Sequence, residues 1–86
     1  MLSENQKKAF ADFHKSPQLE AILGAKTAHM IKIAAAMAYG CYPWIEQLLG
    51  GAKEKGITDE EIGAVQLNVM VVSAGKIMMQ VDDVIE

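Results

Sequence analysis

Apolar residues recur at intervals of three and four along most of the chain, the spacing that places side chains on one face of an α-helix. No segment shows the alternation of apolar and polar residues that a half-buried β-strand needs. We therefore predict an all-α fold, a bundle of four to five helices. The predicted apolar faces consist of Ala9, Phe10 and Phe13; of Leu19, Ile22, Leu23, Met30, Ile33, Ala34 and Met37; and of Trp44, Ile45, Leu48, Leu49 and Ala52.

Residues that cap or break helices mark the first boundaries. Ser3, with Gln6 three residues later, fits a capping box, in which two unpaired backbone N–H groups find side-chain acceptors. Ser16 and Pro17 end this first helix and begin the next, because proline suits the first helical position. Gly24 is a weak point at which the following helical stretch can break, since glycine is a poor helix former.

The later boundaries are marked in the same way. Residues 40–43 predict a tight junction that opens a helix, which we expect to end at Gly56, a natural left-handed residue after a helix. Thr58 and Glu61 form the clearest start signal in the chain, a capping box with acidic residues at the positive end of the helix dipole. The last helix is predicted to run from about residue 59 towards residue 80, leaving an acidic tail.

Two predicted helices are apolar on nearly every side, and this bears on assembly. Residues 27–40, which we expect at the centre of the fold, carry few polar side chains, and residues 62–75 carry no charge. A helix that is apolar all round must be covered all round, which a single chain of 86 residues can hardly do. We therefore expect a homo-oligomer, with close helix contacts at the small residues Ala34, Ala35, Ala36, Ala38, Ala74 and Gly75.

Composition narrows the classes of function. The net charge is −3, with no arginine and no basic stripe, which argues against nucleic-acid binding. The single cysteine excludes an internal disulfide, and no metal-ligand spacing is present, so we predict no metal and no cofactor. The N-terminal residues lack the apolar stretch of a signal peptide, and the charge-free segment 62–75 is too short and too polar to span a bilayer. We expect a soluble cytoplasmic protein that is not bound to a membrane.

The segments 33–45 and 52–62 resemble the carboxymuconolactone decarboxylase/alkylhydroperoxidase D (AhpD)-like family. That family has an apolar helix ending in Gly-Cys, a Cys-x-x-Cys-Ile-x-x-His helix, and then a Gly-x-Thr/Ser-x-Glu-Glu-Ile start to another helix. The resemblance covers roughly residues 19–80. It implies an AhpD-like all-α fold and a trimer or hexamer. We describe residues 1–86 as one domain, with an N-terminal helix over 1–16 and the family-like core over 17–81.

The residues of the redox motif are where this chain departs from the family. By position, Cys41 matches the first cysteine of the alkylhydroperoxidase branch, whereas Trp44 stands at the second cysteine and Leu48 at the histidine. His29 replaces a glutamate twelve residues before Cys41. The resemblance therefore implies no two-cysteine cycle, because no second thiol can resolve a sulfenic acid.

Five residues are candidates for a site. Cys41 and His29 are the catalytic candidates, and Tyr42, Trp44 and Glu46 are expected to line a pocket between subunits. Cys41 stands near a helix start, where the dipole favours the thiolate, but a cysteine there can equally be a small buried packing residue. His29 can be a base or a core histidine. Because ~18 Å of helix separates it from Cys41, the two can meet only if the chain reverses or a neighbouring subunit supplies one of them.

Three hypotheses for function follow. The first is a single-cysteine thiol-redox protein, peroxidase-like rather than a decarboxylase, in which Cys41 reacts and an external thiol reductant completes the cycle. The second is a non-redox enzyme or ligand binder with an intersubunit pocket. The third is an accessory oligomer without catalysis.

Overall fold

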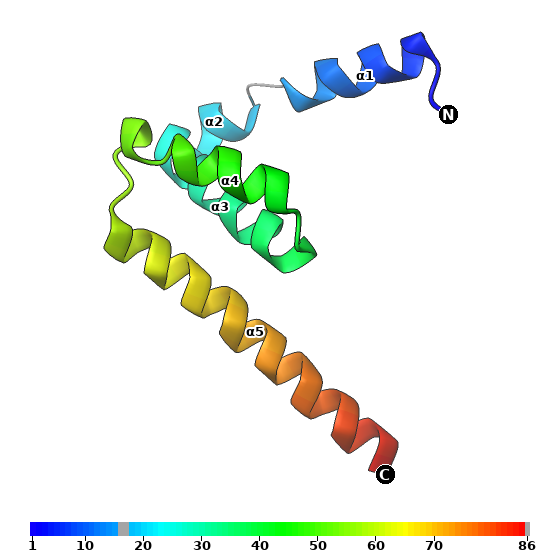
Figure 1. Cartoon of the computed structure of the whole chain (residues 1–86), viewed down its shortest axis with the longest axis vertical. Coiled ribbons are helices and arrows are strands. Elements are labelled where there is room, and N and C mark those ends of the chain that lie inside the picture. The colour runs from blue at the N-terminus through cyan, green and yellow to red at the C-terminus, as the bar shows by residue number, and fades with distance from the viewer. Residues whose placement is uncertain (16–17, 86) are drawn as a thin grey trace.

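The computed structural model describes the backbone of residues 1–15 and 18–85 and the side chains of residues 1–15 and 20–85. Within these residues the chain is helical without strands, so the predicted all-α class is confirmed. In chain order (Figure 1), the elements are α1 (Glu4–His14), α2 (Gln18–Leu23), α3 (Ala25–Tyr39), α4 (Tyr42–Gly50), the 3-10 turn η1 (Lys53–Lys55) and α5 (Asp59–Ile85).

Both predicted capping boxes are confirmed. At the start of α1 the Gln6 backbone N–H donates to the Ser3 hydroxyl at 3.2 Å, and the Ser3 N–H donates to the Gln6 side chain at 2.8 Å. At the start of α5 the Glu61 N–H donates to the Thr58 hydroxyl at 3.1 Å, and the Thr58 N–H donates to the Glu61 carboxylate at 3.0 Å. These bonds satisfy N–H groups that have no partner inside the helix.

The glycine breaks are also confirmed, with one correction. Gly24 has φ 83° and separates α2 from α3, and Gly40 has φ 69° at the end of α3. The prediction of one helix reaching Gly56 is wrong, because α4 ends at Gly50 and η1 follows. Two consecutive glycines, 50 and 51, are costly inside a helix, and Gly56, with φ 76°, ends η1 instead.

The predicted end of the last helix near residue 80 is wrong, because α5 continues to Ile85. Asp82 and Asp83 form the last turns of the helix instead of a tail, since no proline or glycine after Gly75 interrupts it. The predicted boundary at Ser16 and Pro17 lies outside the described residues.

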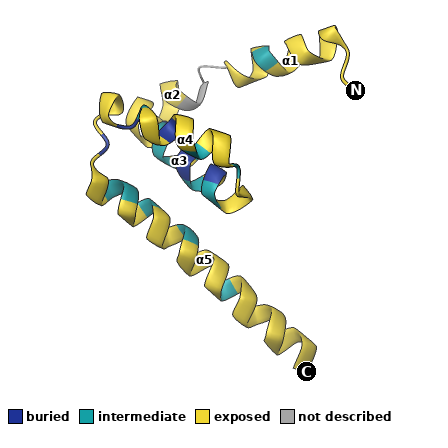
Figure 2. Cartoon of the chain, viewed as in Figure 1, coloured by how far each residue is buried: buried dark blue, intermediate teal, exposed yellow. Residues whose placement is uncertain are grey.

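The core is small and centres on α3, as predicted. This helix packs against α2, α4, η1 and α5. Figure 2 shows the buried residues gathered where α3, α4 and the segment after α4 meet. The core cluster consists of Ile33, Ala36, Leu48, Ala52 and Ile57.

The outer helices leave this core. Neither α1 nor α5 has a buried residue, and the far half of α5 projects away from the other helices (Figure 1). The radius of gyration is 16.3 Å, against about 12 Å for a compact domain of this length. The accessible surface is 7115 Å², against roughly 5,000 Å² for a compact monomer of this mass. One chain alone therefore forms an open arrangement.

By length and composition, α5 is the one helix among the described residues that is long and apolar enough to cross a membrane. This differs from the expectation based on residues 62–75, because the helix extends well beyond that charge-free segment. A core helix of a soluble protein passes the same test while being mostly buried, whereas no residue of the apolar window of α5 is buried within the single chain.

Candidate functional site

The backbone of Cys41 is fixed on both sides by the junction between α3 and α4. The Cys41 N–H donates to the Ala36 carbonyl at 3.0 Å and the Gly40 N–H donates to the Met37 carbonyl at 3.2 Å, which together form a Schellman motif at the end of α3. The Cys41 carbonyl then accepts from the Ile45 N–H at 3.0 Å and opens α4. Because both backbone groups are used, the direction of the Cys41 side chain is set by the junction itself.

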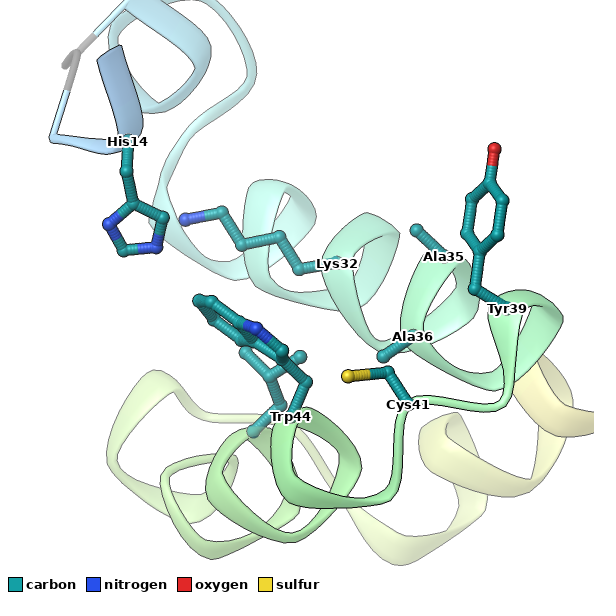
Figure 3. A pocket seen from close by; sticks show the side chains of 8 residues that line it. His14, Lys32, Ala35, Ala36, Tyr39, Cys41 and Trp44 are labelled. Atoms are coloured by element: carbon teal, nitrogen blue, oxygen red, sulfur yellow. The ribbon is translucent and has the colours of Figure 1, made fainter. Parts of the chain in front are cut away.

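The Cys41 thiol is half-buried and borders a pocket of about 280 Å³. Figure 3 shows the sulfur pointing towards Trp44, while the Lys32 amine reaches along the other side towards His14. The pocket lies between α3 and α4 and is mainly apolar. Its lining residues are His14, Lys32, Ala35, Ala36, Tyr39, Cys41, Trp44 and Leu48.

The far edge of this Cys41 pocket comes from α1. The His14 ring lies 5.2 Å from the Trp44 ring and 6.1 Å from the Phe10 ring, measured between centroids. His14 was not among the five candidate residues taken from the sequence. No local pattern could have found His14, because a contact between positions 14 and 44 depends on how α1 packs.

His29 is not among the residues that line the Cys41 pocket. Its Nε2 is 2.7 Å from the Leu48 carbonyl, and because a carbonyl can only accept, Nε2 carries the proton and donates. The Leu48 carbonyl is one of the last four of α4, which have no partner within the helix. The structure does not bring His29 into the pocket of Cys41 within one subunit. Its catalytic role stays a prediction that needs a neighbouring subunit.

The three residues predicted to line one pocket lie in different places. Trp44 lines the Cys41 pocket. Tyr42 lines a second pocket, of about 410 Å³, between α4 and α5. Glu46 is exposed and lines neither of these two pockets.

An ion pair fixes the start of α5 against α3. The Lys26 ammonium lies 2.8 Å from the Glu61 carboxylate. This hydrogen bond from Lys26, followed by the one from the Thr58 backbone N–H, holds the pKa of the Glu61 carboxyl below its ordinary value. No group of three or more His, Cys, Asp or Glu side chains is arranged to hold a metal ion in the part of the chain that the structure describes.

Comparison with known proteins places the chain in a family. The family model described as the carboxymuconolactone decarboxylase family matches residues 7–86. The match begins inside α1 and so includes the helix that brings His14 to the Cys41 pocket. Neither the curated proteins nor the solved structures gave a significant match. Because the match covers nearly the whole length, this chain belongs to the carboxymuconolactone decarboxylase family.

Proposed function

We propose that this protein is a single-cysteine thiol peroxidase that reduces an organic hydroperoxide at Cys41. One observation carries the proposal: the half-buried Cys41 sulfur points into an apolar pocket at the start of α4. A partly exposed thiol at a helix N-terminus has access to a substrate and lies in a field that favours the thiolate.

The reaction is a two-electron oxidation of the thiol. The Cys41 thiolate attacks one oxygen of the hydroperoxide, the O–O bond breaks, and the alkoxide takes a proton from solvent and leaves as an alcohol. Cys41 becomes a sulfenic acid. An external thiol then condenses with it to a mixed disulfide and releases water, and a second external thiol restores Cys41 and leaves as a disulfide. The reductant must come from outside because the chain has one cysteine.

The pocket wall favours an organic substrate over hydrogen peroxide. Ala36, Trp44 and Leu48 offer apolar surface beside the sulfur. Each methylene that a substrate buries there contributes about 0.8 kcal/mol. Lys32 and His14, at the opposite side, suit the polar end of such a molecule.

We further propose that the working form is a homo-oligomer, a trimer or a hexamer, in the cytoplasm. The accessible surface of 7115 Å² exceeds that of a compact monomer by about 2,100 Å². A standard interface removes about 800 Å² from each partner. A single free thiol also suits a reducing compartment.

The second candidate is a non-redox ligand binder in which Cys41 is part of the wall. The position of the Lys32 amine favours it, because Figure 3 shows this cation directed towards His14 and away from the sulfur. A cation turned away from the sulfur suits a cysteine that only lines the wall better than it suits a nucleophile.

The test is consumption of cumene hydroperoxide and of hydrogen peroxide with excess dithiothreitol, in the wild type and in Cys41→Ser. We expect the wild type to consume cumene hydroperoxide faster than hydrogen peroxide by roughly tenfold or more, because cumene hydroperoxide buries apolar area in the pocket. We expect this activity to be lost in Cys41→Ser. Trp44→Ala is the companion variant and is expected to slow cumene hydroperoxide alone. If wild-type Cys41 reacts no faster than free N-acetylcysteine, the thiol is structural and the ligand-binding candidate stands.

A further inference from the structure

The outward side of α5 carries an uninterrupted heptad pattern. Apolar residues follow one another at alternating steps of three and four over the helix, which is the pattern of the contact positions in a coiled coil. All of these side chains are exposed. We name this set the α5 seam: Ala64, Leu67, Val71, Ala74, Met78, Val81 and Ile85.

The α5 seam lies on the opposite side from the face that packs on the same chain. Ile62, Val65 and Val69 are the half-buried residues that face α3 and α4. At about 100° per residue, Val71 points roughly 200° away from Val69. The core of one subunit therefore does not cover the seam.

Beyond residue 73 the helix has two distinct sides. Polar residues repeat opposite the seam, whereas a membrane-spanning helix is apolar towards lipid on all sides. Residues 74–85 pack on no other helix of the same chain, whereas most of the stability of helices in proteins comes from tertiary packing. The polar residues opposite the seam are Ser73, Lys76, Gln80 and Asp83, whereas Asp82 flanks the seam next to Val81.

We infer that the α5 seam packs against the α5 seam of a second copy of this chain. The inference rests on the homo-oligomer proposed above and specifies which surface forms it. A seam is self-complementary, so identical copies can pack through the same surface in twos or threes, as the proposed trimer or hexamer requires. Its residues 64–85 span ~32 Å. The surface in excess of a compact monomer, about 2,100 Å² per chain, is of the size that permanent interfaces bury.

Two neighbouring methionines provide a matched test. Met78 lies in the seam and is 65% exposed, and Met79 lies beside it outside the seam and is 63% exposed. We expect Met78→Lys to raise the dissociation constant of the assembly by roughly tenfold or more, because the charge must be desolvated. Met79→Lys is expected to leave the assembly unchanged. Sedimentation over a dilution series gives the masses, and far-UV circular dichroism checks that both variants fold.

Several results overturn the inference. If the wild type is a monomer at micromolar concentration, the assembly itself is rejected. If the two lysine variants have the same dissociation constant, the seam is rejected and the assembly forms through another surface. Wild-type protein that sediments with phosphatidylcholine vesicles, with both variants released equally, assigns α5 to a membrane. None of these readouts depends on whether Cys41 reacts.

A measurement on the wild type alone covers the case in which Met78→Lys does not fold. Hydrogen exchange of the amides in residues 74–85 is expected to be slow in the assembly and to accelerate on dilution as the mass falls. Exchange that is equally fast at all concentrations contradicts the seam.

Discussion

Replacing His29 by alanine removes the bond that holds the end of α4 against α3. The Nε2 of His29 donates to the Leu48 carbonyl at 2.7 Å, and that carbonyl has no partner inside α4. A neutral hydrogen bond contributes ~0.5–1.5 kcal/mol, and an acceptor left unpaired adds to the loss. Because His29 is half-buried, we expect destabilisation of about 1–2 kcal/mol. In a domain of this size the melting temperature falls by roughly 4–8 °C for each kcal/mol.

The measurement is thermal unfolding followed by far-UV circular dichroism at one protein concentration, because assembly makes the melting temperature depend on concentration. His29→Gln is the matched variant, since its amide N–H can also donate to the Leu48 carbonyl. We expect it to recover most of the stability. Lys8→Ala is a control at an exposed position outside this bond, where we expect a change within about 0.5 kcal/mol.

The same variants separate a structural from a catalytic role. The Leu48 side chain lines the Cys41 pocket, so His29 positions one wall of that pocket through the end of α4. The rate at which iodoacetamide alkylates Cys41 should therefore differ from the wild-type rate in His29→Ala and return towards it in His29→Gln. This reasoning would be refuted if His29→Ala kept the wild-type melting temperature but lost Cys41 reactivity, and if His29→Gln did not restore that reactivity. Such a result would favour a catalytic His29.

Three further predictions concern the fold. Ile33 is fully buried, so Ile33→Ala should cost about 2–5 kcal/mol and Ile33→Val about 0.5–1.5 kcal/mol in urea unfolding; equal, small losses would contradict the packing. Gly40→Ala should cost about 1 kcal/mol from its positive φ alone, because its added Cβ meets nothing within 4 Å; an increase in stability would argue against the left-handed turn. Folding lowers the pKa of Glu61, so the contribution of this carboxylate to stability is present above its ordinary pKa of 4.5 and is lost as the pH falls below that value. Glu61→Gln should therefore make the free energy of unfolding fall less steeply at acidic pH. The same acid dependence in the variant and the wild type would exclude the ion pair with Lys26.

Helix boundaries were predictable because they depend on neighbours in sequence. The capping boxes at Ser3 and Thr58 are closed by residues three positions later. A positive φ at Gly24 and Gly40 likewise follows from what glycine tolerates. The end of α4 was not predicted because the apolar pattern continues through Gly50 and Gly51 to Ala52, whereas in the structure the cost of two glycines inside a helix outweighs that pattern.

The sequence by itself determined the all-α class, the placement of Cys41 at a helix junction and the lack of a second thiol. Tertiary structure decided what surrounds that thiol. His14 reaches Trp44 from another helix, and His29 bonds to a carbonyl 19 residues away instead of approaching Cys41. Bonds between near neighbours are set by local backbone geometry, whereas contacts between helices depend on how apolar faces pack, which local patterns do not encode. The heptad steps of α5 were present in the sequence, but only the packing of its other face on α3 and α4 showed that the seam is left uncovered.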